Sequence, residues 1–270
     1  VDFVIEGGVS GILAFGSNGE FYVIEEDEQY RGLEIILDQA KKRVPVYFGI
    51  GAIGTKKCIA LAQKALSLGA RAVSVLQPMF LKPNEKELLN HFSSIADAIK
   101  GKDMLLYNNP GRVGYGMTAD LVVKLVERCD NIVGIKDSSG DMTLTSELIR
   151  RTLHTPFKVL GGKDTLIYGI LAHGGHGAVA TMANIFPELV CSIYRSYEQG
   201  DIRQSLEFQR ALNPLRLLLD KASFPVGTKD YANLNGQDVG LPYLPSLPSD
   251  ESVLSLMREQ MKIAGFLPGR

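Results

Sequence analysis

Short apolar runs alternate with longer amphipathic segments along the first two thirds of the chain. The runs have the length of buried strands, and the segments between them repeat their apolar positions with the period of a helix. This alternation is typical of βαβ units and predicts a parallel sheet covered by helices. Seven strands are expected, at residues 11–16, 44–51, 72–78, 104–108, 132–136, 158–161 and 177–181.

The segments between these strands are expected to be helices, at residues 25–42, 55–68, 85–99, 119–128, 144–152 and 166–172. Seven strands are one short of a closed barrel, and a chain of 270 residues suits that fold. Residues 1–8 have the pattern of a helix that ends at Gly7 and Gly8. We therefore predict an α/β fold, a (β/α)8 TIM barrel whose first strand precedes the given sequence.

The strand pattern stops after Thr181, and the rest of the chain has the pattern of a helical appendage. Helices are expected at residues 187–195, 203–220 and 251–263, with a Pro- and Gly-rich link at 235–248. The prediction thus divides the chain into a barrel, residues 1–184, and a C-terminal helical region, residues 185–270.

Composition and charge narrow the class of ligand. The chain has 45% hydrophobic and 22% charged residues and a net charge of -1, which is ordinary for a globular protein. It offers no basic surface for nucleic acid or an anionic membrane and no apolar run of about 18 residues. Three separated cysteines without a CxxC motif favour a reducing compartment, so we expect a cytoplasmic protein. A small molecule is the expected ligand.

The strand at 132–136 ends in a lysine and then breaks into polar turn residues. Because barrel enzymes keep their active sites at the carboxyl ends of the strands, Lys136 is expected to project into the site. A free lysine has a pKa of about 10.4, and an apolar mouth of the barrel would lower that pKa and make the amine a Schiff-base nucleophile. The alternative is a lysine at the rim of the barrel that pairs with Asp137 or Asp141.

Two other strand ends carry candidate chemistry. Ser17 and Asn18 follow the first strand in a glycine-containing turn, which is a natural cradle for a carboxylate but also typical of any strand-to-helix turn. Tyr107 and Arg112 lie at and after the end of the strand at 104–108. The phenol suits proton transfer and the guanidinium suits a carboxylate; a core tyrosine and a surface arginine are the alternatives.

Three further motifs have residue types that can bind a cofactor, a phosphate group or a metal. The G-x-G-x-x-G at 49–54 lacks an acidic residue at the end of the next strand, so no nicotinamide site is expected. The glycine pairs at 161–162 and 174–175 favour either a phosphosugar or close approach to another substrate, with Gly162 on the floor of the site. His173 and His176 lack a third ligand at useful spacing, so no metal is expected.

Three motifs occur in order and on the expected strand spacing: Gly-x-x-Gly-Glu at 16–20, Tyr-Asn-x-Pro-x-Arg at 107–112 and Gly-Ile-Lys-Asp at 134–137. Together they resemble the dihydrodipicolinate synthase / N-acetylneuraminate lyase family of class I aldolases, over essentially the whole chain. The resemblance implies that Lys136 forms a Schiff base with pyruvate or another 2-keto acid. It also implies that Tyr107 transfers protons and that the backbone amides of Ser17 and Asn18 hold the carboxylate.

The resemblance further implies a lyase that acts on pyruvate plus an aldehyde, or on a 2-keto-3-deoxy sugar acid in the reverse direction. It implies a homotetramer, a dimer of dimers, with no metal or organic cofactor.

Two departures from the family pattern leave alternatives open. Phe80 stands where the synthases have a tyrosine for the partner subunit's site, and Asn18 stands where they have a threonine. Arg112 matches the arginine that the synthases use for the second substrate's carboxylate. Dihydrodipicolinate (4-hydroxy-tetrahydrodipicolinate) synthase proper and a non-catalytic barrel that binds keto acids are therefore the alternatives.

Overall fold

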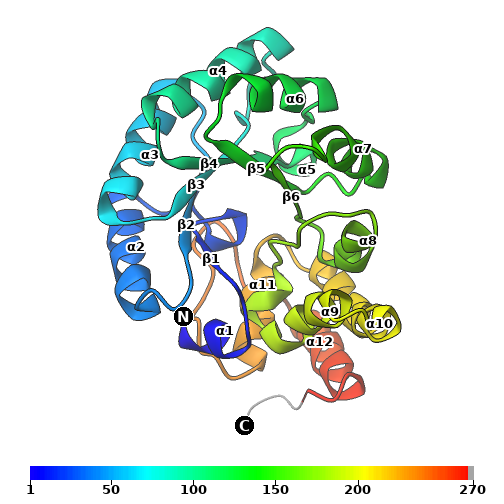
Figure 1. The fold of residues 1–270 in the computed structure, drawn as a ribbon. Helices are drawn as coiled ribbons and strands as arrows, with labels where there is room; N and C mark the ends of the chain where they lie inside the picture. The colour runs from blue at the N-terminus through cyan, green and yellow to red at the C-terminus, as the bar shows by residue number, and fades with distance from the viewer. Residues whose placement is uncertain (267–270) are drawn as a thin grey trace.

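Six parallel strands form one curled sheet, with helices around its outside (Figure 1). The computed structural model describes residues 1–266. Each strand pairs in parallel with the next strand along the chain, so the sheet order is β1 to β6. The strands are β1 (Ile12–Ala14), β2 (Val46–Ile50), β3 (Ala72–Leu76), β4 (Asp103–Asn108), β5 (Ile132–Asp137) and β6 (Lys158–Gly161).

The helices fall into two groups. Those that accompany the sheet are α1 (Asp2–Glu6), α2 (Glu26–Ala40), α3 (Thr55–Leu68), α4 (Glu85–Ala98), α5 (Pro110–Val113), α6 (Ala119–Arg128), α7 (Met142–Thr152) and α8 (Ile167–Ala172). The C-terminal helices are α9 (Pro187–Glu198), α10 (Ile202–Leu218), α11 (Val226–Leu234) and α12 (Glu251–Ile263). Within residues 1–266, no helix combines the length and the apolar character that crossing a bilayer requires.

The prediction of a seventh strand at residues 177–181 is wrong. Ala178 alone pairs with β6, as an isolated bridge. Gly177 has a φ of 134°, a conformation that interrupts extended backbone. Beyond the bridge, the backbone N–H of Thr181 donates to the carboxylate of Asp164 at 3.1 Å instead of to a neighbouring strand. The other six expected strands are confirmed, with ends that differ from the expected ones by two residues at most.

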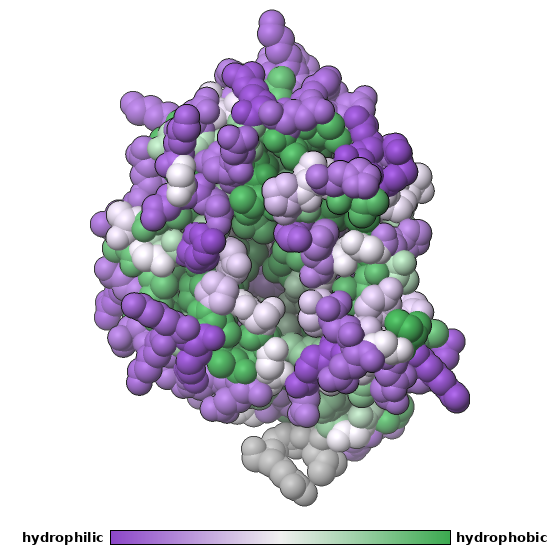
Figure 2. Space-filling model, in the orientation of Figure 1, coloured by the Kyte–Doolittle hydropathy of each residue, from purple (hydrophilic) through white to green (hydrophobic). Residues whose placement is uncertain are grey.

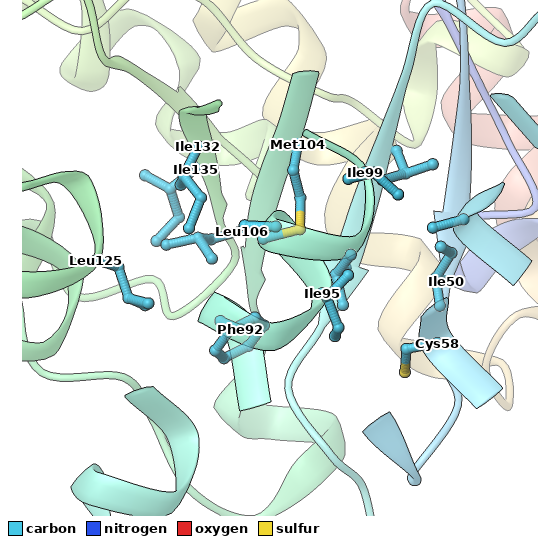
Figure 3. Packing of buried hydrophobic residues seen from close by; sticks show 14 of the residues in the cluster. Ile50, Cys58, Phe92, Ile95, Ile99, Met104, Leu106, Leu125, Ile132 and Ile135 are labelled. Atoms are coloured by element: carbon cyan, nitrogen blue, oxygen red, sulfur yellow. The ribbon is translucent and has the colours of Figure 1, made fainter. Parts of the chain in front are cut away.

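Two large clusters of buried apolar side chains stabilise the fold, beside a small third one around Leu76, Tyr107 and Val113. The larger one lies between the sheet and its helices, and Figure 3 shows Met104 and Leu106 of β4 near Phe92 and Ile95 of α4. These four side chains are fully buried. The second cluster joins α8 to the C-terminal helices. Helix α8 contacts β6 and α7, which precede the predicted boundary at residue 184, and also α9 and α10, which follow it. The division of the chain into two regions stays a prediction.

The glycines of the motif at 49–54 are explained by packing. A Cβ on Gly49 would collide with the backbone carbonyl of Phe15, and a Cβ on Gly51 would collide with the ring of Phe21. Both glycines therefore let the turn after β1 approach β2 closely. The motif follows β2 of a curled sheet with sequential strand order, unlike the order of dinucleotide-binding folds.

Candidate active site

A polar cavity of about 410 Å³ lies at the carboxyl ends of the strands and is roofed by the C-terminal region. In the space-filling view, polar residues cover the outer rim of the molecule and the face is hollowed near its middle (Figure 2). All the candidate residues line this one cavity: Ser17, Asn18, Tyr107, Arg112, Lys136 and Gly162. The structure thus brings together side chains that are far apart in the sequence.

Lys136 is a buried amine beside a phenol ring. Its side chain comes from the end of β5, where it pairs in register with Tyr107 of β4. Its residue surface is 7% exposed, and Nζ lies 4.4 Å from the centroid of the Tyr107 ring. An aromatic face at this distance attracts an ammonium group and holds the lysine toward the cavity.

The two carboxylates that were alternatives for pairing with Lys136 are bound elsewhere. Asp137 accepts hydrogen bonds from Asn108 Nδ2 at 2.9 Å and Thr145 Oγ1 at 2.6 Å. Asp141 accepts from backbone N–H groups in the first turn of α7. Adjacent residues of a strand point to opposite faces, so Asp137 faces the helices while Lys136 faces the cavity. The interpretation of Lys136 as an ion-paired rim lysine is therefore wrong.

Tyr107 places its hydroxyl in a small hydrogen-bond network. Tyr107 Oη lies 3.2 Å from Ser17 Oγ and accepts a hydrogen bond from Asn109 Nδ2 at 2.8 Å. Burial raises the pKa of Tyr107, but the charge of Lys136 and hydrogen bonds with Ser17, Asn109 and Ser138 outweigh it. The net result is a Tyr107 pKa below the usual value of a phenol. Such a phenol exchanges its proton more readily near neutral pH.

Asn18 uses its side chain within the protein. Asn18 Nδ2 donates to Thr181 Oγ1 at 2.8 Å, and Asn18 Oδ1 accepts from Thr228 Oγ1 at 3.0 Å. The turn itself is a short 3₁₀ helix, Ser17–Gly19, whose first backbone bond runs from Gly19 N–H to the carbonyl of residue 16 at 2.8 Å. The N–H groups of residues 17 and 18 precede that bond, so they suit an anion as the N-terminal donors of a helix do.

Arg112 lies at the cavity mouth. The centre of its guanidinium lies 3.7 Å from the centroid of the Phe224 ring, a stacking distance. Stacking occupies the flat face and leaves the N–H edge available for a carboxylate. Two more cations line the cavity: Lys163, and Arg216, which pairs with Asp220 at 3.0 Å. The cavity wall is accordingly suited to anionic ligands.

Two buried carboxylates, one lining the cavity and one beside it, have contacts that the sequence did not predict. Glu20 is 3% exposed and pairs with Lys229 Nζ at 2.7 Å. Asp164 is buried and lines the cavity, and its carboxylate binds the backbone after the isolated bridge. Desolvation by burial raises the pKa of Asp164, although these backbone donors oppose the shift. The sequence showed Glu20 at the end of the first motif but gave no sign of Lys229 as its partner.

The glycine pairs near residues 161 and 174 do not form a phosphate cradle. The backbone N–H groups of Gly161, Gly162, Gly175 and His176 all donate to carbonyl oxygens of the chain. His176 also accepts the Val159 N–H at Nδ1, 3.2 Å away, so the imidazole supports β6. The phosphosugar alternative therefore lacks the free donors that it requires.

Gly162 sits against the candidate nucleophile. A Cβ on this residue would collide with Ser138 Oγ and would lie 3.2 Å from Lys136 Cε. The Gly162 N–H donates to the Asp137 carbonyl at 2.8 Å, so the backbone cannot retreat without losing this bond. A glycine here lets the chain pass directly beside the lysine stem.

Gly162→Ala is expected to lower the rate of imine formation by about 100-fold, because the methyl group displaces the amine from its productive geometry. The free energy of unfolding should fall by about 1–3 kcal/mol through overpacking. Reductive trapping with a keto acid and denaturant unfolding measure the two effects. Gly169→Ala on α8 is the matched control, since a Cβ there meets nothing within 4 Å. A normal trapping rate in Gly162→Ala would contradict this account.

The fold and the cavity define a class of protein: a parallel barrel with a buried lysine at the end of one strand and a tyrosine at the end of its neighbour. This is the arrangement expected of an aldolase that works through an imine. A sequence model of the Dihydrodipicolinate synthetase family matches residues 1–264, and the chain belongs to this family. It is a lyase of the class I aldolase type.

Relatives cover nearly the whole chain. The 4-hydroxy-tetrahydrodipicolinate synthase of Methanopyrus kandleri is 33% identical over 268 residues, which span 99% of this chain and 89% of that protein. A crystal structure of dihydrodipicolinate synthase is similar with a TM-score of 0.94 and 30% identity, covering 98% of this chain and 91% of that one. YagE, a prophage protein of the family from E. coli K12 solved with pyruvate, has a TM-score of 0.93 and 27% identity, covering 98% and 90%. The predicted family, barrel fold and enzyme class are confirmed.

Proposed function

We propose that Lys136 forms a Schiff base with the keto carbon of pyruvate or a related 2-keto acid. The observation that carries this proposal is the buried Lys136 amine 4.4 Å from the Tyr107 ring. An amine without a paired carboxylate in residues 1–266 is free to attack a carbonyl once it loses its proton. The polar wall of the cavity accepts the water that leaves when the imine forms.

Tyr107 is the proton carrier in this proposal. Attack by the Lys136 amine gives a carbinolamine, whose hydroxyl must be protonated before water departs. The protonated imine then draws electrons from the adjacent C–H bond, and the resulting enamine attacks an aldehyde carbon. Each step moves a proton near the imine, where Tyr107 Oη and Ser17 Oγ are 3.2 Å apart. In the reverse direction the same groups cleave the carbon–carbon bond.

The keto acid's carboxylate is assigned to the turn after β1. The backbone amides of Ser17 and Asn18 begin the 3₁₀ helix there and lie on the cavity wall. Backbone donors suit this task because they are fixed before the ligand arrives. Gly162 supplies the open floor beside Lys136 that the planar imine requires.

For the second substrate we favour an aldehyde, or a 2-keto-3-deoxy sugar acid in the cleavage direction. 4-Hydroxy-tetrahydrodipicolinate synthesis is the second candidate, because Arg112 is poised at the mouth and relatives carry that name. Phe80 is 94% exposed and is not part of the cavity wall in this chain. The proton path proposed for this chain therefore runs from Tyr107 to Ser17 without a second phenol.

Arg112→Met is expected to raise the KM for a carboxylate-bearing aldehyde by about tenfold or more, because it removes a charge-assisted hydrogen-bond pair. The KM for pyruvate should stay the same, since that ligand is bound at the opposite turn. Steady-state kinetics with each substrate varied in turn measure both values. Arg210→Met, which breaks only an exposed ion pair with Glu207, is the control. An equal rise in both KM values would contradict the assignment.

The other parts of the proposed function rest on the family resemblance and composition. We propose a homotetramer, a dimer of dimers, and a reaction that needs no metal or organic cofactor beyond the lysine imine. A cytoplasmic location is supported by three free cysteines, two of them buried.

A further inference from the structure

The C-terminal helix α11 reaches across the cavity to the turn after β1. Two consecutive residues of α11, Thr228 and Lys229, make these contacts. Thr228 Oγ1 donates to Asn18 Oδ1 at 3.0 Å, and Lys229 Nζ pairs with the Glu20 carboxylate at 2.7 Å. The turn is thus held at two points by one element that lies more than two hundred residues further along the chain.

The turn has backbone features that call for outside support. Phe15 and Glu20, which flank it, have φ values of 53° and 54°, in the left-handed region that side-chain-bearing residues rarely adopt. Such conformations persist only where the surrounding structure over-determines them. Because the segment between them includes Ser17 and Asn18, a relaxed turn would change the direction of their backbone N–H groups.

The contacts that hold the turn are largely shielded from solvent. Glu20 is 3% exposed and the Lys229 side chain 19% exposed, so salt and water screen the pair little. Tyr243, in the link after α11, adds its backbone N–H to Glu20 at 3.1 Å. On the Asn18 side, the amide donates to Thr181 and accepts from Thr228, so both of its ends are fixed.

We propose that α11 is a positioning element for the carboxylate-binding turn. Thr228 acts through Asn18 and Lys229 acts through Glu20, and together they keep the backbone N–H groups of residues 17 and 18 aimed into the cavity. The inference rests on the proposed function, in which this turn binds the keto acid's carboxylate. It makes Thr228 and Lys229 positioning residues for the affinity and charge preference of the site.

The test compares reductive trapping of pyruvate with trapping of methyl pyruvate, which keeps the keto group but lacks the negative charge. Wild-type protein should require less pyruvate than ester for half-maximal trapping. Thr228→Val should raise the half-saturating pyruvate concentration about fivefold, as expected for loss of one hydrogen bond. It should leave the ester value and the maximal rate nearly unchanged. Thr228→Ser should restore the wild-type preference, and Lys229→Met should narrow it as Thr228→Val does.

Asn233→Ala is the control on the same helix. Its side chain bonds to Gly240 and Val239 in the link, so its loss weakens α11 without touching the turn. The proposal is overturned if Asn233→Ala shifts the pyruvate value as much as Thr228→Val, or if Thr228→Val and Lys229→Met both keep the wild-type preference. If wild-type protein traps neither compound, the proposed function itself fails. If it traps both compounds equally well, the imine chemistry stands and the assignment of the carboxylate to this turn is overturned.

Discussion

Lys136→Met should abolish covalent trapping of pyruvate and lower the lyase activity by at least about 1000-fold, because no other group replaces the attacking amine. Methionine keeps most of the length of the lysine side chain, whose terminal Nζ lies over the Tyr107 ring. The free energy of unfolding should stay the same or rise, since a buried cation without a paired carboxylate in the described chain is removed. Activity assays and denaturant unfolding measure the two effects.

Lys163→Met is the matched control for this variant. Lys163 lines the same cavity, and its stem lies near Gly140 rather than near the Tyr107 ring. Its loss should leave the pyruvate adduct in place. If the adduct survives Lys136→Met and disappears in Lys163→Met, the nucleophile is Lys163 and the role proposed for Lys136 is wrong.

Tyr107→Phe should lower the turnover rate by about 100- to 10,000-fold, the range of a lost general acid–base group. The ring stays in place against Lys136, so the loss reports the hydroxyl alone. In wild-type protein the rate should decline on the alkaline side at a pH below 10, because the pKa of Tyr107 is lowered and a phenolate cannot donate a proton. That decline should be missing from the Tyr107→Phe profile.

Tyr115→Phe is the control for the tyrosine variant. Tyr115 donates to the Pro78 carbonyl at 2.8 Å, and burial raises its pKa to about 12. Its replacement should cost about 1 kcal/mol of stability and leave the pH–rate profile unchanged. The role given to Tyr107 would be contradicted if both variants kept normal turnover, or if Tyr107→Phe kept the alkaline decline.

Six of the seven strands that the alternating pattern predicted are present, because each of them is a short, largely apolar run followed by an amphipathic helix. The pattern failed at 177–181, where the run is apolar but Gly177 adopts a conformation that ends extended structure. It also missed α11 (Val226–Leu234), whose sequence mixes glycine, lysine and aspartate and whose packing comes from the fold. Periodicity does not record such tertiary contacts.

The candidate site was predictable where a residue follows a strand. Lys136 and Tyr107 end neighbouring strands, and parallel pairing alone brings them together. The sequence placed Asn18 at the cavity but did not predict the contacts of its side chain. That side chain forms hydrogen bonds with Thr181 and Thr228 and is not free to bind a ligand. The Glu20–Lys229 pair joins distant segments, so no local pattern announces it.

The proposed reaction depends on Lys136 carrying the imine. Incubation of the wild-type protein with pyruvate and cyanoborohydride, followed by intact and peptide mass spectrometry, tests this. We expect one reduced pyruvate adduct per chain, on the peptide that contains Lys136. An unmodified protein that is folded and saturated with pyruvate, or an adduct confined to another lysine, would contradict this role of Lys136.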